Sequence, residues 1–230
     1  MLMVALSCGQ VEDGIYDPEF NVYGLLFSTQ TIQEIIVDRT YLMDEPSGQY
    51  VDDALVVLSS DGYIDTLVFS SAWGKYMSSI SHNLQPATTY TLSVTRVGFD
   101  TLYGSTHVPD TFSILNPVYD TLTLEDTIVF TKSIGAALYG CWVTEISTLM
   151  KINFVVWSDP DDSLESFILG EYFYNIPSSL YEISITAYDS NYYSYHFERT
   201  DSIHCAGVTG GVGLFGSSWN ARKEFYIITD

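Results

Sequence analysis

Basic side chains are scarce in this sequence. Its 230 residues hold 8 Lys and Arg against 29 Asp and Glu, which gives a formal net charge of −21 at pH 7. Nucleic acid is bound by clustered Lys and Arg that neutralise phosphates, and anionic lipid surfaces attract the same clusters. The composition therefore argues against both as partners. The carboxylates predict a well-solvated surface whose copies repel one another, with a cation-binding surface as the alternative.

Long apolar runs and catalytic motifs are missing as well. No stretch reaches the roughly 18 apolar residues of a candidate membrane-spanning helix. The four histidines form no pair at helical spacing and no HExxH zinc motif, and no G-x-S-x-G sequence provides a nucleophilic serine. We therefore expect a protein that is not an enzyme and that has no cofactor or metal site.

Aromatic residues, by contrast, make up 15% of the chain, and many Thr, Val and Ile accompany them, as is typical of strands. The clearest pattern follows Pro86, where Tyr90, Leu92 and Val94 alternate with polar residues and so share one face of a strand. The Pro-x-Thr-x-Tyr lead-in resembles the start of strand F in fibronectin type III and immunoglobulin-like modules. In those modules a corner tyrosine bonds back to the upstream backbone.

A second copy of this pattern follows Pro177, with Tyr181, Ile183 and Ile185 alternating in the same way. The two tyrosines lie about 90 residues apart, roughly the length of one sandwich domain. We predict an all-β fold of two tandem immunoglobulin- or fibronectin-like β-sandwich modules. The predicted division is a truncated signal end at 1–8, a tether at 9–20, an N-terminal β-sandwich at 21–111 and a C-terminal β-sandwich at 112–230.

Short strands separated by turns fill both modules. In the first module we expect strands at 22–27, 34–41, 53–59, 66–70, 75–80, around Tyr90 and at 101–108. In the second we expect strands at 112–115, 121–124, 127–130, 136–146, 150–157, 167–174, around Tyr181, and at 189–198 and 224–228. No helix of three turns has convincing caps.

Two stretches suggest binding motifs that their context does not support. Gly211–Gly216 fits the dinucleotide fingerprint G-x-G-x-x-G, but that motif requires a following helix and an acidic residue about twenty positions later, and too few residues remain. We expect these glycines to permit tight turns or close backbone approach. The acidic stretch 159–162 lacks the spacing of a calcium loop, so we expect a solvated hairpin tip.

The three cysteines carry separate predictions. The apolar run Met1–Leu6, followed by the small residue Ser7 and by Cys8, resembles the end of a bacterial lipoprotein signal peptide, in which the cysteine is diacylated and becomes the new N-terminus. This predicts a lipid anchor at Cys8, and the missing basic n-region predicts a true start further upstream. An incidental or buried cysteine is the alternative. Cys141 and Cys205 then form a disulfide in the second module, or Cys141 is a buried thiol.

Aromatic residues concentrate near position 195. In a strand over 189–198, Tyr193, Tyr195 and Phe197 share one face. Such a row is either a core-facing stripe or, where exposed, an aromatic platform of the kind that sugar-binding modules use.

The order of these features resembles the Gram-negative outer-membrane lipoprotein family catalogued as domain of unknown function 4249. The resemblance is carried by Ser7-Cys8, 21–24, 51–57, the Tyr90 strand, Val108-Pro109, 192–195 and 207–216. It implies a lipid-anchored bacterial outer-membrane protein beside TonB-dependent transport barrels, with no established catalytic residues. We therefore expect a non-enzymatic envelope protein that serves an outer-membrane transport receptor. The alternative is a secreted or surface glycan-binding or adhesive module.

Overall fold

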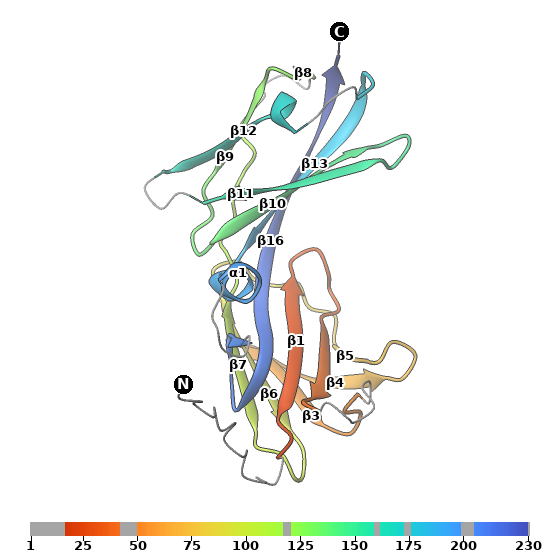
Figure 1. The fold of residues 1–230 in the computed structure, drawn as a ribbon, viewed down its shortest axis with the longest axis vertical. Helices are drawn as coiled ribbons and strands as arrows, with labels where there is room; N and C mark the ends of the chain where they lie inside the picture. The colour runs from red at the N-terminus through yellow and green to blue at the C-terminus, as the bar shows by residue number, and fades with distance from the viewer. Residues whose placement is uncertain are drawn as a thin grey trace, which may run out of the picture.

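The computed structural model describes residues 17–41, 50–116, 121–158, 162–172, 176–198 and 205–229. It shows two β-sandwich modules stacked end to end, with one long strand, β16 (Gly211–Ile228), running through both (Figure 1). Cys8, His204, most of the predicted tether and most of the acidic stretch 159–162 lie outside the described residues.

The first module has the strand order of a fibronectin type III sandwich. One layer has the order β1-β2-β5 and the other has the order β4-β3-β6-β7, with β4 also pairing to β5 at their shared edge. The strands are β1 (Phe20–Phe27), β2 (Glu34–Arg39), β3 (Leu55–Ser60), β4 (Tyr63–Ser70), β5 (Lys75–Met77), β6 (Thr89–Thr95) and β7 (Leu102–His107). All seven overlap the predicted strands.

The second module repeats this arrangement. Strands β11, β10 and β13 and the second half of β16 form one layer, while β12 and β9 form the other, to which Ile114 adds a bridge at Phe130. The strands are β8 (Thr121–Thr123), β9 (Thr127–Thr131), β10 (Leu138–Glu145), β11 (Lys151–Trp157), β12 (Leu164–Ile168) and β13 (Ser179–Tyr188), and a 3-10 turn, η1 (Leu169–Glu171), follows β12. The prediction of an all-β, two-module sandwich fold is confirmed.

Both corner tyrosines occupy the predicted positions. Tyr90 is fully buried, and its hydroxyl accepts a hydrogen bond from the backbone N–H of Gln85 at 3.1 Å. Tyr181 donates to the carbonyl of Pro177 at 2.9 Å. The two phenols thus tie β6 and β13, each in its own module, to the turn before the strand, as the sequence pattern predicts.

Each module has its own apolar core. The first core contains Leu58, Leu92 and Phe215, and the second contains Tyr139, Ile183 and Phe225. Trp219, on β16, packs against both cores. The side chain at this one position therefore links the two modules directly.

The boundary between the modules differs from the predicted one. Residues 205–218, which the sequence assigns to the second module, lie in the first: Gly211–Ser218 pairs in parallel with β1, and β15 (Val208–Thr209) pairs with β7. The same strand then pairs antiparallel with β13 from Ser218 to Ile227. One continuous strand thus serves as an added strand of the first module and as the last strand of the second.

Glycine makes the pairing of β16 with β1 possible. Gly213 has a φ of +114°, and a Cβ at this position would lie 1.9 Å from the carbonyl oxygen of Val22. Only glycine accepts both that conformation and that approach. The expectation that the G-x-G-x-x-G glycines permit close backbone approach is confirmed at Gly213, and these residues lie inside a strand with no helix after them.

The predicted strand at 189–198 is wrong: Ser190–Phe197 forms the helix α1. Asp189 caps it, because its side chain accepts from the backbone N–H of Tyr192 at 2.9 Å. The helix lies where the two modules meet (Figure 1).

Candidate functional site

Helix α1 packs on the outer side of the continuous sheet formed by β10, β13, β16 and β1. Leu25 of β1, Leu138 of β10 and Tyr188 of β13 are buried beneath it, and Tyr192 and Tyr193 of the helix pack against them. Because β1 belongs to the first module and β10 to the second, this small cluster joins the two. Burial raises the pKa of Tyr188 and of Tyr192, so both phenols are uncharged at neutral pH.

A buried carboxylate fixes the start of this helix. Asp189 is 3% exposed and accepts hydrogen bonds from the hydroxyl of Thr106 on β7 and, at 3.4 Å, from that of Ser217 on β16. Burial raises the pKa of Asp189, although the hydrogen bonds from Thr106, Tyr192 and Ser217 oppose the shift.

A side chain within the helix also binds the first module. Asn191 Nδ2 donates to the carbonyl oxygens of Ser105 at 2.8 Å and Phe215 at 2.9 Å. Together with Asp189 it holds α1 in one position on the sheet, so the aromatic side chains of the helix are presented from a fixed backbone.

The aromatic residues predicted as a platform point to two different sides of the helix. Tyr193 and Phe197 are four residues apart on the helix and stack at 6.1 Å, and the ring of Trp157 on β11 lies 5.1 Å from Phe197 and 6.0 Å from Tyr193. Tyr195 instead contacts Tyr23 of β1 at 6.2 Å. The expectation that all three share one face is therefore wrong, because it assumed the period of a strand.

These rings do not form a buried stripe. No residue of α1 is buried, Phe197 is 41% exposed and Trp157 is 54% exposed. Trp157 was not singled out from the sequence, because only the register of β11 against β10 places it beside the helix. An exposed aromatic cluster thus lies at the junction.

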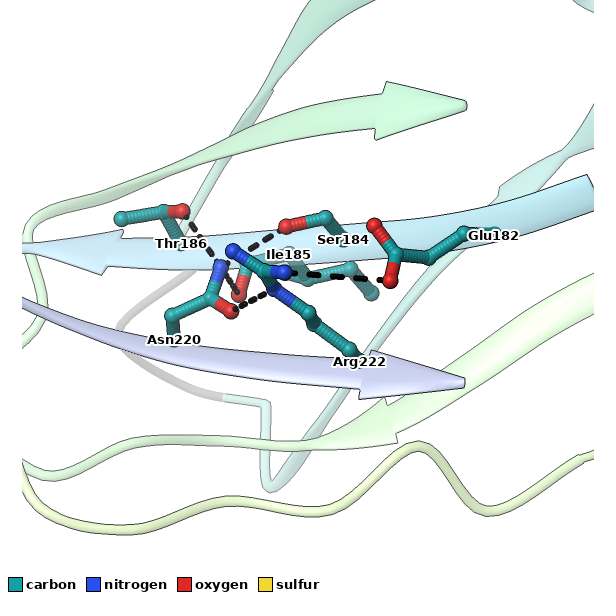
Figure 2. Close-up of polar contacts among 6 residues, drawn as sticks. All are labelled: Glu182, Ser184, Ile185, Thr186, Asn220 and Arg222. Atoms are coloured by element: carbon teal, nitrogen blue, oxygen red, sulfur yellow. Dashed lines mark hydrogen bonds and ion pairs between the residues drawn. The ribbon is translucent and has the colours of Figure 1, made fainter. Parts of the chain in front are cut away.

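A polar cluster lies further along the same side of the sheet (Figure 2). Asn220 of β16 donates through Nδ2 to Ser184 Oγ at 2.9 Å, Thr186 Oγ1 at 2.8 Å and the carbonyl of Ile185 at 3.1 Å. These side chains are on the outer side because Phe225 and Ile227, at odd positions of β16, face the core.

Arg222 extends this cluster. Its Nε donates to Asn220 Oδ1 at 2.9 Å, and its Nη1 lies 3.8 Å from Glu182 Oε2 (Figure 2). The guanidinium thus has one hydrogen bond and one longer ion pair, while the side chain remains 53% exposed. We call this side of the second module the junction face and define it by Trp142, Trp157, Ser184, Thr186, Asn220, Arg222, Tyr193 and Phe197.

The first module has a distinctive surface of its own, on the outer side of the layer β4-β3-β6-β7. The outward positions of its strands alternate with core positions, and none is Asp, Glu, Lys or Arg. We call it the charge-poor face; its residues are Leu55, Val57, Ser59, Ile64, Thr66, Val68, Ser70, Thr89, Thr91, Ser93, Thr95, Tyr103, Ser105 and His107. A groove of about 650 Å³ runs along it between Ser59, Thr91 and Tyr103.

The two remaining cysteines are not bonded to each other. Cys141 is buried in the second core, whereas Cys205 is exposed on β14 (Cys205–Ala206), which pairs with the part of β16 that belongs to the first module. The disulfide alternative is therefore wrong, because the two residues belong to different modules, and the buried-thiol alternative holds for Cys141. Burial raises the pKa of the Cys141 thiol well above its usual range.

Within the described residues, no group of three or more His, Cys, Asp or Glu side chains is arranged to hold a metal ion. The helices of that part of the chain do not reach the length and hydropathy of a bilayer span.

The class of fold is thus a tandem pair of fibronectin-like sandwiches. No family model matches the chain, and no curated protein matches it. Among solved structures it is similar to the FN1–FN3 domains of chicken CNTN1 (8% identity, TM-score 0.25, 93% of this chain and 68% of that chain covered). It is also similar to a two-domain fibronectin type III segment of chicken tenascin (12% identity, TM-score 0.23, 75% and 91% covered) and to domains from titin (7% identity, TM-score 0.24, 91% and 67% covered). Because the sequence identities and TM-scores are this low, we assign the sandwich fold from the strand order and the two cores and not from these similarities.

Proposed function

We propose that this chain is a non-enzymatic, lipid-anchored protein of the bacterial outer membrane that docks on a TonB-dependent transport receptor through its charge-poor face. The observation that carries the proposal is the absence of charged side chains from that face, in a chain whose net charge is −21. A random surface of such a chain would present carboxylates.

The composition of this face suits a protein partner. Ile64 is 71% exposed, Val68 and Tyr103 are each 61% exposed, and Leu55 is 53% exposed. The centres of protein interfaces are depleted of charge and enriched in tyrosine. Between these residues the small hydroxyls of Ser59, Thr91 and Ser93 line the groove, so a partner can enter it without desolvating an ion.

Cys8, the proposed anchor, directly precedes the module that has the charge-poor face. Acylation of Cys8 would tether the first module, whose first strand begins at Phe20. The 12 residues of 9–20 reach at most about 40 Å when extended. The first module is therefore the one held near the membrane, within reach of a receptor embedded there.

Capture of the partner from native outer membranes tests this proposal. We expect the full-length protein to recover a transport receptor, identified by mass spectrometry, and Cys8→Ala to recover at least tenfold less because the anchor is lost. Thr91→Lys adds a charge at the centre of the charge-poor face and should reduce recovery to the same extent. Ser166→Lys, which adds the same charge to an exposed position of β12 in the second module, is the matched control. Equal recovery by Thr91→Lys and Ser166→Lys would contradict docking through this face.

A glycan-binding module is the second candidate function, and the exposure of the junction aromatics favours it. A core-facing stripe would have buried Trp157 and Phe197, whereas both present about half of their surface. This function needs no receptor, so purified protein is sufficient to test it.

A further inference from the structure

The indole of Trp142 lies along the surface of the second-module sheet. A Cβ built on Gly140, two residues earlier on β10, would lie 2.7 Å from Cη2 and 2.9 Å from Cζ3 of Trp142, and 3.0 Å from Cε2 of Tyr188. The six-membered ring of the indole therefore occupies the space that any other residue at position 140 would fill. One side of this ring rests on the sheet, and the side chain is partly buried, packed against the cluster of Leu25, Leu138 and Tyr188.

Strand register places polar groups beside this ring. Gly140 is opposite Thr186, and Thr186 is opposite Asn220; in the next row Trp142 is opposite Ser184, and Ser184 is opposite Arg222. Neighbouring strands are about 4.8 Å apart. The hydroxyls of β13 are therefore one strand away from the indole, and Asn220 and Arg222 are two strands away.

A second aromatic surface lies on the other side of Trp142. Val155 of β11 is opposite Gly140, and Trp157, two residues further, is opposite Leu138. The exposed rings of Trp157 and Phe197 meet edge to face there, 5.1 Å apart. The junction face thus presents aromatic surface over a length of several residues, with the polar cluster along one side.

This arrangement has the chemistry of a saccharide site. A pyranose ring has an apolar side of C–H groups that stacks on an indole, and hydroxyls at its edge that hydrogen-bond to amide, guanidinium and carboxylate groups. Arg222 already donates a hydrogen bond to Asn220, which lowers the side-chain entropy that is lost when a ligand binds.

The charged side chains on this side of the sheet indicate whether a saccharide bound there is neutral or charged. Outward positions of this sheet hold Lys151 and Arg222 against Glu182 and Glu224, so the face has both signs in balance although the chain is strongly acidic. We propose that the junction face binds a neutral saccharide chain, with one pyranose ring on Trp142 and its hydroxyls against Arg222 and Glu182. This inference rests on the second candidate function and specifies its site and ligand class.

Affinity electrophoresis in native gels containing dextran, laminarin, xyloglucan or galactomannan tests the site on the purified full-length chain. We expect at least one polysaccharide to retard the wild-type protein, and Trp142→Ala and Arg222→Ala to weaken the apparent affinity at least tenfold. Trp157→Ala changes an exposed side chain and should fold normally, and it should weaken binding as well. Trp73→Ala, which removes a 71% exposed tryptophan of the first module, is the matched control and should bind like wild type.

The possible results distinguish a failure of the proposed saccharide site from a failure of glycan binding as a function. Retardation of wild type, Trp142→Ala and Trp157→Ala to the same extent would overturn the site while leaving glycan binding in place. No retardation of wild type by any of the four polysaccharides would overturn both. Loss of receptor capture by Trp157→Ala in membranes, without any retardation by polysaccharide, would assign the junction face to a protein partner instead and would also overturn the saccharide proposal.

Discussion

At the scale of single residues, Asp189 has two opposing effects: its hydrogen bonds stabilise the fold, and its burial disfavours the charged carboxylate. It caps α1 and accepts hydrogen bonds from β7 and β16, yet it is almost completely removed from water. A buried carboxylate is disfavoured in its charged form unless its hydrogen bonds compensate fully. Since the pKa of Asp189 is raised above its ordinary value of 3.8, burial outweighs the hydrogen bonds.

This shift predicts a pH dependence with a definite sign. The folded chain binds the proton of Asp189 more tightly than the unfolded chain, so the contribution of this group to stability is complete below about pH 4 and is lost as the pH rises through the folded-state pKa. Asp189→Asn keeps a good N-cap residue and removes the titration. We expect the melting temperature of the variant, relative to wild type, to rise between about pH 4 and pH 8.

Melting curves of both proteins across this pH range provide the measurement, and the difference between them cancels the titration of the other carboxylates. A difference that falls with rising pH would mean that the hydrogen bonds from Thr106, Ser217 and Tyr192 stabilise the carboxylate more than burial destabilises it.

At the scale of elements, alternation predicted most strands. It failed at 169–171, where the predicted strand 167–174 gives way to the 3-10 turn η1, and in two longer segments. The Tyr90 strand has period two because one of its faces is buried, and its prediction is confirmed residue by residue. The segment 190–197 has the same aromatic alternation but forms a helix, because Asp189 caps it and Asn191 fixes it to β7 and β16. Asp189 before this segment is the signal that could have indicated a helix.

The other failure is the first half of β16. Gly211, Gly213 and Gly216 weaken any strand pattern, and the partner of this segment, β1, is almost 200 residues earlier in the sequence. The same limit applies to the candidate site: the alternation of β13 predicts that Ser184 and Thr186 face outward, but only the observed register shows that Asn220 and Trp142 flank them.

The pairing of β16 with β1 therefore depends on glycine. We expect Gly213→Ala to lower the free energy of unfolding by about 2 kcal/mol or more, because it adds strain at positive φ and a clash with Val22. Gly98→Ala has a similar φ of +86° but open space around it, and should cost about 1 kcal/mol. Urea denaturation of both variants gives the comparison. A Gly213→Ala variant no less stable than Gly98→Ala would show that β16 does not approach β1 this closely.

At the scale of the whole molecule, β16 makes the two modules mechanically continuous. Its 18 residues span about 60 Å at the usual rise of a strand, and the hydrogen-bonded pairing passes from β1 to β13 at Ser218 without a break. Tandem modules joined by a flexible linker can unfold one at a time. Here, unfolding the first module would free the first half of the strand that closes the second and would remove one of the two surfaces on which Trp219 packs.

We therefore expect the modules to unfold together. Leu92→Ala makes a cavity in the first core and should lower its stability by about 2–5 kcal/mol. If the modules are coupled, the slowest-exchanging amides of β10 and β13, in the second module, lose protection by the same amount in hydrogen-exchange measurements on the full chain. If only amides of the first module exchange faster, the modules unfold independently. In that case α1 and the junction face would not be rigidly coupled to both modules. A ligand on that face could then not stabilise the first module through β16.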